Sequence, residues 1–484
     1  MISLAELTAG LPDGRPVPAR EIAELVAARG SVLVVLDDDP TGTQSVADLP
    51  VLTGWSEEDL RWALTRGAGA VYVMTNSRSL DPAEAEHRNR DVARAALAAS
   101  ARTGVPIGFV SRSDSTLRGH FPLETDTLAD ELASAGRPVD GVVLVPAFGD
   151  AGRVTVHGTH YAGSPAAGFV PVGETEFARD ATFGYVSSTL PDWVQEKTGG
   201  RIRRADVVTI DLALLRTDLD AVAERLLRVR GGGVIAADCL VENDLRLLAL
   251  ALERVEARGR SFLYRVGPPF PRARIGQEVH PPLTRADVDA IATSARAVAD
   301  SPAGRSAAAN HGLVVVGSHV GLTTRQLDAL RDRRSPTEIE IEVAAVLGEG
   351  RDAHLSDVVD RAVAALGSGT TVVRTSRTLM RADTPQESLD IARRVSAAVV
   401  EVVRRVLAAK PPRFVIAKGG ITSSDVATLG LGIRRAFVRG PMLPGIVSLW
   451  EPVDGPARGI PYVVFAGNVG TDESLADVVD TLSA

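Results

Sequence analysis

Short, continuous apolar runs recur along the first half of the chain, and each ends in a polar segment. Side chains alternate between the two faces of a strand, so a run without alternation predicts a strand buried on both faces, as in a parallel sheet. The charged stretch 81–100 has helical periodicity, and other helix-like segments separate the runs. The apolar runs lie within 31–36, 69–77, 106–115, 140–148, 205–212 and 232–239.

A second series of the same kind follows a less regular middle. Residues 268–284 are rich in proline and arginine, 301–312 are small and polar, and one helix-like stretch, 285–300, lies between them. A helix is also predicted over 387–410. Alternating strands and helices predict an α/β fold in two domains, each a mainly parallel sheet flanked by helices. The second set of predicted strands is 313–318, 337–343, 370–375, 413–420, 434–440, 445–451 and 461–470.

Length and composition agree with two domains. A chain of 484 residues exceeds what one hydrophobic core usually supports. We predict a first domain over 1–270, a crossover or linker region over 271–312, and a second domain over 313–484.

Charge and cysteine content exclude several classes of protein. The net charge is −8 with no basic tail, which argues against a nucleic-acid partner. The single cysteine, Cys239, excludes an intrachain disulfide and a multi-cysteine metal site, and we expect a buried thiol. The N-terminus lacks the pattern of a signal peptide, and no apolar run is long enough to span a membrane, so a cytoplasmic enzyme is the simplest expectation.

The stretch LDDDPTGTQ, residues 36–44, places three aspartates at the end of an apolar strand. Asp37, Asp38 and Asp39 would repel one another in an apolar setting unless they face a metal, a cationic partner or donor hydroxyls. The alternative is a solvated turn or a helix cap, and the residues alone leave both open.

Three more strands end in loops of similar character: TNSRSL (75–80), SRSDSTLRGH (111–120) and VPAFGDAGRVTVHGTHY (145–161). Guanidinium forks bind carboxylate or phosphate, and an aspartate accepts hydrogen bonds from hydroxyls. The histidines have no metal-site spacing. Four such loops at strand ends favour a site for a small polyhydroxylated anion. The candidate ligands in these three loops are Asn76, Arg78, Arg112, Asp114, Arg118 and Arg153.

Glycine-rich turns replace the charged loops in the second half. The segments 314–326, 415–427 and 463–479 each read as strand, glycine turn and helix start. Glycine lets backbone N–H groups approach a ligand, and helix N-termini favour anions, so these turns predict a phosphate and nucleotide site. The chain has neither a G-x-x-x-x-G-K-[ST] loop nor a complete G-x-G-x-x-G after a strand.

Taken together, these motifs resemble the four-carbon acid sugar kinases, which phosphorylate threonate, erythronate or 3-oxo-tetronate with ATP. The resemblance rests on LDDDPTGTQ, SRSDSTLRGH, VPAFGDAGRVTVHGTHY, FLYRVGPPFPRARIG, VVVGSHV, AKGGITSSDVA and VVFAGNVGTDE, which run in family order over nearly the whole chain. It implies a sugar-acid-binding N-terminal domain, a nucleotide-binding C-terminal domain and an active site between them.

The same resemblance implies roles for individual residues. Many family members carry D-D-x-T-G-A in the first loop and G-G-E-T in the nucleotide loop, so Ile421 stands where those proteins have glutamate. Acid-sugar contacts would fall on Asp37, Asp38, Arg112, Asp114 and Arg118, and ATP contacts on Ser318, Gly419, Gly420, Ile421, Thr422 and Gly467.

The implied reaction transfers the γ-phosphoryl group of ATP, with Mg²⁺ bridging the phosphates, to a hydroxyl of the sugar acid. Asp38 or Asp114 would orient or deprotonate that hydroxyl, and the choice stays open. A sugar acid and ATP are the expected partners, with no nucleic acid or membrane, and a homo-oligomer is left open.

Two alternatives remain on the sequence alone. A nicotinamide-dependent hydroxyacid dehydrogenase would place an acidic residue about 20 residues after its glycine turn, and Glu338, Glu340 and Glu342 follow VGSHVG at that spacing. A non-catalytic sugar-acid sensor is the other.

Overall fold

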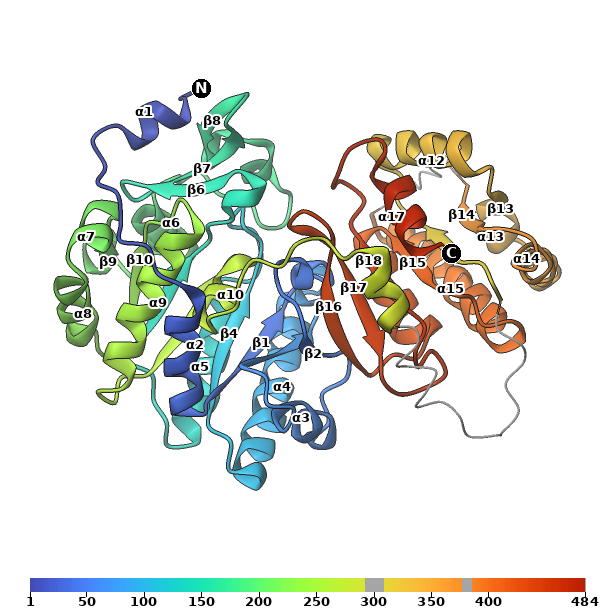
Figure 1. Ribbon diagram of the computed structural model, residues 1–484. Helices are drawn as coiled ribbons and strands as arrows, with labels where there is room; N and C mark the ends of the chain where they lie inside the picture. The colour runs from blue at the N-terminus through green and yellow to red at the C-terminus, as the bar shows by residue number, and fades with distance from the viewer. Residues whose placement is uncertain (292–308, 377–384, 484) are drawn as a thin grey trace. The chain divides into compact units, whose positions relative to one another are not determined.

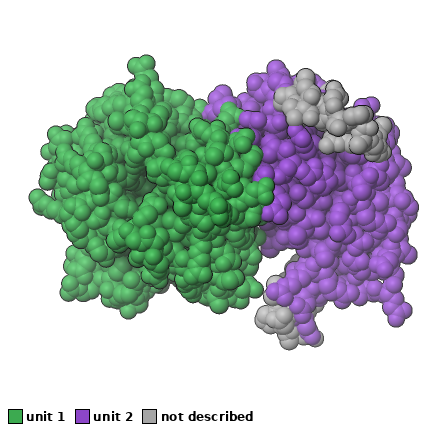
Figure 2. Space-filling model, turned by 90° about the horizontal axis from the view of Figure 1, so that it is seen from below, with its two compact units in different colours: residues 1–279 green, residues 280–484 purple. Residues whose placement is uncertain are grey.

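The computed structural model describes residues 1–291, 309–376 and 385–483. The chain forms two units, residues 1–279 and residues 280–484, which Figure 2 distinguishes by colour. Most of the helix predicted over 285–300 falls outside the described residues.

The main sheet of unit 1 is parallel throughout its described pairs, in the order β2-β3-β1-β4-β11-β5-β10-β9. Every residue of β1 is buried, as the continuous apolar run predicts. The strands are β1 (Val32–Asp37), β2 (Leu49–Leu52), β3 (Ala70–Met74), β4 (Ile107–Arg112), β5 (Gly141–Val145), β9 (Val208–Ile210), β10 (Gly233–Ala237) and β11 (Phe262–Val266).

The register of this sheet aligns the strand ends that carry the polar loops. Asp37, the last residue of β1, lies opposite Arg112, the last residue of β4. Arg112 in turn lies opposite Val266 at the end of β11. Parallel strands present their carboxyl ends at one edge, so these loops meet there.

Helices cover both faces of the sheet (Figure 1). Side chains of α3, α4 and α5 complete one hydrophobic core with β1, β3 and β4, and α2, α7, α8, α9 and α10 contact one another in a second layer. The unit 1 helices are α1 (Leu4–Thr8), α2 (Ala19–Arg29), α3 (Glu57–Leu64), α4 (Pro82–Thr103), α5 (Leu123–Ser134), α6 (Leu190–Lys197), α7 (Leu212–Thr217), α8 (Leu219–Arg228), α9 (Glu242–Glu256) and α10 (Pro269–Arg274).

Local sequence sets the ends of α4, the helix predicted over 81–100. The Asp81 side chain accepts a hydrogen bond from the Glu84 N–H at 2.9 Å, and Pro82 occupies the first helical position, which needs no donor. Gly104 ends the helix with φ of 72°, a left-handed conformation that glycine adopts without steric cost.

The segment predicted as a loop over 145–161 contains strands instead. β6 (Arg153–Val156), β7 (Thr159–Ser164) and β8 (Gly168–Pro171) form a small antiparallel sheet. Val154 and Val156 alternate with polar residues, which is the period-2 pattern of a strand, and Thr155 between them is buried as well. His157 and Gly158, both at positive φ, make a two-residue hairpin turn, a signal that the loop prediction overlooked.

Unit 2 has a sheet in the order β13-β14-β12-β15-β18-β17-β16. Its pairs are parallel from β13 to β18, whereas β17 pairs antiparallel with both β16 and β18. The predicted architecture, a mainly parallel α/β sheet in each half, is confirmed. The strands are β12 (Leu313–Val316), β13 (Thr337–Ile341), β14 (Thr371–Thr375), β15 (Val415–Lys418), β16 (Arg435–Leu443), β17 (Ile446–Pro452) and β18 (Tyr462–Phe465).

The unit 2 sheet also has helices on both faces. The helices α12 and α17 share a core with β12, β15 and β18, while α13, α14 and α15 contact one another in a separate layer. None of the helices in the described residues is long and apolar enough to cross a membrane. The helices are α12 (Gly321–Arg334), α13 (Val343–Leu347), α14 (Arg351–Ala365), α15 (Pro385–Ala409), α16 (Gly420–Asp425), which continues as a π-helix over Val426–Gly430, and α17 (Ser474–Leu482).

Candidate functional site

The candidate site of unit 1 lies at the carboxyl ends of β1, β3 and β4, and we call it the strand-end site. The ion pair between Asp37 and Arg112 forms its base. Both side chains are buried, and the Arg112 guanidinium donates to an Asp37 carboxylate oxygen and to the Asp39 carbonyl. Gly42 lies directly above, where a Cβ would overlap both side chains. Burial raises the pKa of Asp37 to about 7, although the charge of Arg112 acts in the opposite direction.

Asp38 is held by a bidentate arginine. Arg78 donates from Nη2 to Asp38 Oδ1 at 2.6 Å and from Nε to Asp38 Oδ2 at 3.1 Å. Ser113 Oγ donates to the same Oδ2 at 2.7 Å. Burial would raise the pKa of Asp38, but the charges of Arg78 and Arg112 outweigh it and the pKa is lowered. Asp38 is therefore an ionised, fully engaged carboxylate.

Asp114 is the more accessible of the two candidate catalytic aspartates. Arg118 Nε donates to its Oδ2 at 2.7 Å, and the Thr116 hydroxyl donates to the same oxygen. Within the described part of the chain, Asp114 Oδ1 has no hydrogen-bond partner. The side chain is 13% exposed against 2% for Asp38. Burial opposes ionisation, but Arg78 and Arg118 lower the pKa of Asp114 to about 2.

Arg118 and Arg153 lie on the same aromatic ring. The guanidinium carbons stand 5.2 Å and 5.6 Å from the centre of the Phe177 ring. Arg118 also pairs with Asp180 at 3.5 Å, and Arg153 Nε is buried without a partner among the described residues. Burial lowers the pKa of Arg153, and the nearby charge of Arg118 lowers it further. The two guanidinium groups therefore lie side by side next to Asp114, which pairs with Arg118.

Asn76 contributes backbone rather than side chain to this cluster. It sits after β3 with φ of 50°, and its N–H donates to the Asp37 carbonyl at 3.2 Å. The structure therefore brings the unit 1 candidates together around the ends of β1, β3 and β4, with Arg153 joining from β6.

A buried ion pair that the sequence did not reveal lies beneath the site. Glu124 of α5 receives hydrogen bonds from Arg265 at 2.6 Å, from Ser77 at 2.5 Å and from Ser111 at 3.0 Å. These partners lie far apart along the chain, and Glu124 stands in a helical segment where a charged residue is ordinary. Phe177 and Asp180 were missed for a similar reason, since segment 172–189 carries no motif.

The histidines of the unit 1 loops have structural roles. His160 is buried between the Thr155 hydroxyl at 2.9 Å and the Ser115 carbonyl at 2.7 Å, and burial lowers its pKa to about 4. His120 Nε2 lies 3.1 Å from the carbonyls of Ser77 and Leu80. The predicted buried thiol is also found, because Cys239 is buried.

The three glycine turns of unit 2 converge on Ser318. A Cβ on Gly467 would stand 2.5 Å from Ser318 Oγ, and one on Gly419 would stand 3.5 Å from Ser318 and 3.2 Å from Thr422 Oγ1. Thr323 Oγ1 donates to the Gly467 carbonyl at 3.0 Å. A Cβ on Gly420 would meet nothing within 4 Å, so open space lies at the start of α16. The first N–H groups of a helix have no partner inside it, which suits an anion.

Ile421 does not join these turns. Its side chain is 61% exposed, and it lines a cavity of about 430 Å³ with Asp425, Leu429 and residues of α15. The acidic residues of β13 are also occupied, because Arg374 pairs with Glu338 at 3.2 Å and with Glu340 at 2.6 Å. That pairing engages two of the three carboxylates, Glu338 and Glu340 but not Glu342, that a dinucleotide-binding dehydrogenase could use.

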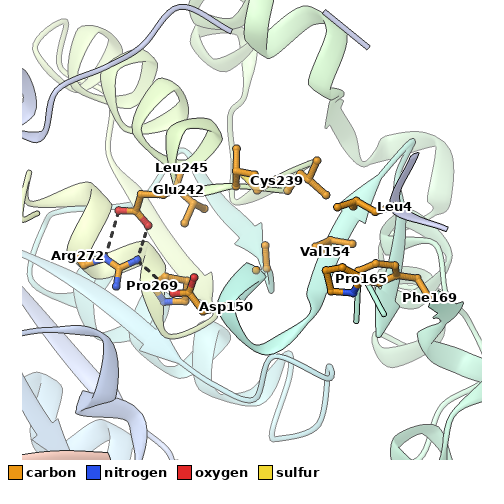
Figure 3. A pocket seen from close by; sticks show the side chains of 14 residues that line it. Leu4, Asp150, Val154, Pro165, Phe169, Cys239, Glu242, Leu245, Pro269 and Arg272 are labelled. Atoms are coloured by element: carbon orange, nitrogen blue, oxygen red, sulfur yellow. Dashed lines mark hydrogen bonds and ion pairs between the residues drawn. The ribbon is translucent and has the colours of Figure 1, made fainter. Parts of the chain in front are cut away.

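A separate cavity of about 280 Å³ lies in unit 1 between the β6–β8 sheet and the start of α9 (Figure 3). Leu4, Val154 and Phe169 line its apolar side, and Arg272 and Glu242 lie at the other. Arg272 is already engaged, by Glu242 at 2.5 Å and by the Ser45 carbonyl at 3.2 Å. The cavity therefore lacks the unused charged donors that the strand-end cluster has.

A protein-built metal centre is absent from the described residues, which contain no group of three or more His, Cys, Asp or Glu side chains placed to hold an ion.

Comparisons with known proteins agree with the division of the chain. The family model for the "Sugar-binding N-terminal domain" matches residues 33–274, and that for the "Nucleotide-binding C-terminal domain" matches residues 313–475. The D-erythronate kinase of Heliobacterium modesticaldum is 24% identical over 477 residues, covering 93% of this chain and 97% of the relative. The D-threonate kinase of Salmonella typhimurium is 23% identical, covering 92% and 97%.

Solved structures share the fold. A crystal structure described as a tRNA synthase from Salmonella typhimurium LT2 aligns with a TM-score of 0.65 at 19% identity, covering 92% of this chain and 98% of that one. A Haemophilus influenzae protein of the DUF1537 family aligns with a TM-score of 0.61 at 18% identity, covering 93% and 100%.

Together, the paired domain matches define a two-domain enzyme with sugar-binding and nucleotide-binding halves. The chain belongs to the four-carbon acid sugar kinase family. It is a phosphotransferase with an alcohol group as acceptor.

Proposed function

We propose that the protein transfers the γ-phosphoryl group of ATP to a hydroxyl of a four-carbon acid sugar such as D-erythronate, D-threonate or a 3-oxo-tetronate. The observation that carries this proposal is that each unit has a candidate site at its strand ends and that the two sites contain different residue types. Unit 1 presents carboxylates and guanidinium groups, and unit 2 presents glycine turns and hydroxyls. On this proposal the sugar-acid domain is 1–270, the crossover region is 271–312 and the nucleotide domain is 313–484.

The acid sugar would bind at the unit 1 cluster. Its carboxylate suits Arg118 and Arg153, because the two guanidinium groups lie on one ring and Arg153 has a donor to spare. Asp37 and Arg112 are buried against each other, so we assign them to shaping the loop beneath the substrate. The ion pair of Arg78 and Asp38 would also shape this loop. The backbone N–H of Asn76, which donates to the Asp37 carbonyl, would hold the loop after β3 next to it.

Asp114 is the best candidate to orient the attacking hydroxyl. Its Oδ1 is available, whereas both oxygens of Asp38 already accept from Arg78. A pKa of about 2 makes Asp114 a weak base, but phosphoryl transfer depends more on positioning and charge than on early proton removal. Asp114 would hold the hydroxyl by accepting its proton in a hydrogen bond.

ATP would bind at the unit 2 turns. The open space beside Gly420 gives a phosphate room to approach the backbone, and the neighbouring Gly419 and Gly467 lie against Ser318. Mg²⁺, carried on the phosphate oxygens, would neutralise charge during transfer. Ile421 would contact the nucleotide only beyond the phosphates.

The test is to incubate the purified protein with Mg²⁺, ATP and, one at a time, D- and L-erythronate, D- and L-threonate and their 3-oxo derivatives. We expect ADP and a phosphorylated acid sugar with one or two of these compounds and no ADP without an acceptor. Absence of ADP with every compound would contradict the proposal.

The same preparations test the two alternatives. NADH formation with NAD⁺ and a four-carbon acid would indicate a dehydrogenase. Binding of one acid without any turnover would indicate a sensor.

A further inference from the structure

Lys418, the last residue of β15, carries a buried amino group for which the proposed mechanism has no role. Its side chain is fully buried on the face of the sheet that holds Val316, Ile416 and Phe465. Nζ donates to the Ala466 carbonyl at 2.9 Å and lies 3.8 Å from the centre of the Phe465 ring. No carboxylate among the described residues pairs with it.

The position of Lys418 relates it to two of the glycine turns. Gly419 and Gly420 follow it directly, and its Nζ reaches the residue just before Gly467. The backbone adds two more links, because the Gly419 N–H donates to the Phe465 carbonyl at 2.8 Å and the Gly317 N–H donates to the Lys418 carbonyl at 3.3 Å. A charge on Nζ would therefore lie beneath the proposed phosphate site.

The ionisable side chains on the surrounding elements have other partners. Asp425 of α16 accepts from the Ser396 hydroxyl, and the Tyr462 hydroxyl of β18 donates to the Ser423 carbonyl. On α12, Arg325 pairs with Asp472 and Arg333 with Asp477 of α17. Burial alone lowers the pKa of Lys418, to about 7, so the amino group exchanges its proton near neutral pH.

We propose that Lys418 is a further nucleotide-binding residue, whose buried amino group takes up a proton when phosphates bind at the glycine turns and then supplies the positive charge beneath them. The inference rests on the proposed nucleotide site. The proton adds to the lone pair of Nζ and comes from the solvent, and no other bond forms or breaks. An anion close to a buried lysine favours its charged form, so binding and protonation reinforce one another.

The test is calorimetric titration of the full-length protein with Mg²⁺–ADP at pH 8, in two buffers with different ionisation enthalpies. At this pH the phosphates of ADP are already deprotonated, so they contribute little. For a shift of one pKa unit from about 7, we expect wild type to take up about 0.4 proton per ADP and Lys418→Met to take up none. Lys410→Met makes the same substitution just after α15, five residues before β15 begins, and should behave as wild type.

Affinity gives a second readout. ADP binding to wild type should weaken between pH 7 and pH 9, because the proton that accompanies binding becomes scarce. Lys418→Met should bind about fivefold more weakly at pH 7, the change that a shift of one pKa unit from about 7 gives at that pH, and the difference should shrink toward pH 9.

Three outcomes would overturn the inference. Equal proton uptake in wild type and Lys418→Met would do so. A loss of affinity in the variant that is the same at every pH would show that the lysine only ties the turns together. If wild type binds no ADP, the nucleotide site itself is wrong. In the first two cases ADP binding by wild type leaves the proposed function intact.

Discussion

The candidate sites of unit 1 and unit 2 both lie at the carboxyl ends of parallel strands, but they are built from different residue types. In unit 1, buried guanidinium groups face buried carboxylates, as Arg112 faces Asp37 and Arg78 faces Asp38. In unit 2, glycine turns and hydroxyls surround open space, and Lys418 is the only buried cation there among the described residues.

The difference follows from what each site has to recognise. A small hydroxylated acid presents hydroxyl and carboxylate groups in a fixed stereochemical arrangement, which directional side chains can distinguish. Phosphates present similar oxygens on every side, and backbone N–H groups suffice for them. Charge pairing keeps the first site rigid, while the absence of Cβ atoms keeps the second one open.

The strongest test of the comparison is to neutralise one carboxylate of unit 1. Asp114→Asn should lower kcat by about 10²–10⁴-fold, because the substrate hydroxyl loses its charged acceptor. ADP affinity should not change, since we propose that ADP binds to residues of unit 2 only. Steady-state kinetics and ADP titration measure the two quantities. Asp126→Asn, on the exposed side of α5, is the matched control, and a kcat for Asp114→Asn within threefold of it would exclude the assigned role.

Removing the buried guanidinium of Arg112 should show that its ion pair with Asp37 stabilises unit 1. Arg112→Met leaves Asp37 buried without its partner, and we expect a loss of about 3–5 kcal/mol in the free energy of unfolding at pH 8. Asp37 can take up a proton at lower pH, since its pKa is already about 7, so the loss should be smaller at pH 5. Urea unfolding at both pH values measures this.

Arg203→Met is the control for that substitution, because Arg203 pairs with Asp206 at the exposed surface and should contribute nothing measurable. A stable Arg112→Met protein would show that the buried pair does not hold the loop.

In unit 2, adding one methyl group at Gly420 should weaken ADP binding without lowering the stability of the fold. Gly420→Ala meets no protein atom within 4 Å, so the unfolding temperature should not fall. If phosphates approach the backbone there, the methyl group should weaken ADP binding about tenfold, or by about 1.4 kcal/mol. Calorimetric titration and thermal unfolding measure both quantities. Gly369→Ala, also in open space but away from the turns, should leave ADP affinity unchanged.

The last expected effect concerns the pH dependence of stability. The pKa of Lys418 is lowered in the folded protein, so between about pH 7 and pH 10 the unfolded chain binds more protons and the free energy of unfolding rises with pH. Lys418→Met should remove this rise and should be more stable than wild type at pH 7. Urea unfolding at pH 7 and pH 9 tests it, and parallel pH profiles for the two proteins would show that Lys418 is not the group responsible.

The sequence was sufficient to predict the α/β architecture and to point to the loops. A continuous run such as 31–36 has few interpretations, and the polar residues that follow it come to the sheet edge by topology alone. Glycine turns after strands were equally visible, and Gly419 and Gly467 do lie on either side of Ser318.

The sequence could not predict which charges pair. Arg112 and Asp37 meet because β1 and β4 are neighbours in register, and Glu124 meets Arg265 because α5 packs beneath β11. Strand order carries this information, and no local motif encodes it. Ile421 stays a predicted nucleotide contact, with a side chain that is 61% exposed.

The cluster around Asp114 contains nearly equal numbers of opposite charges. Asp37, Asp38, Asp39 and Asp114 are matched by Arg78, Arg112, Arg118 and Arg153, in a protein whose net charge is −8. Such a site projects little field into the solvent, so it cannot draw a distant anion toward itself. Capture of the acid sugar therefore depends on contact at short range, and its association rate should be nearly independent of ionic strength.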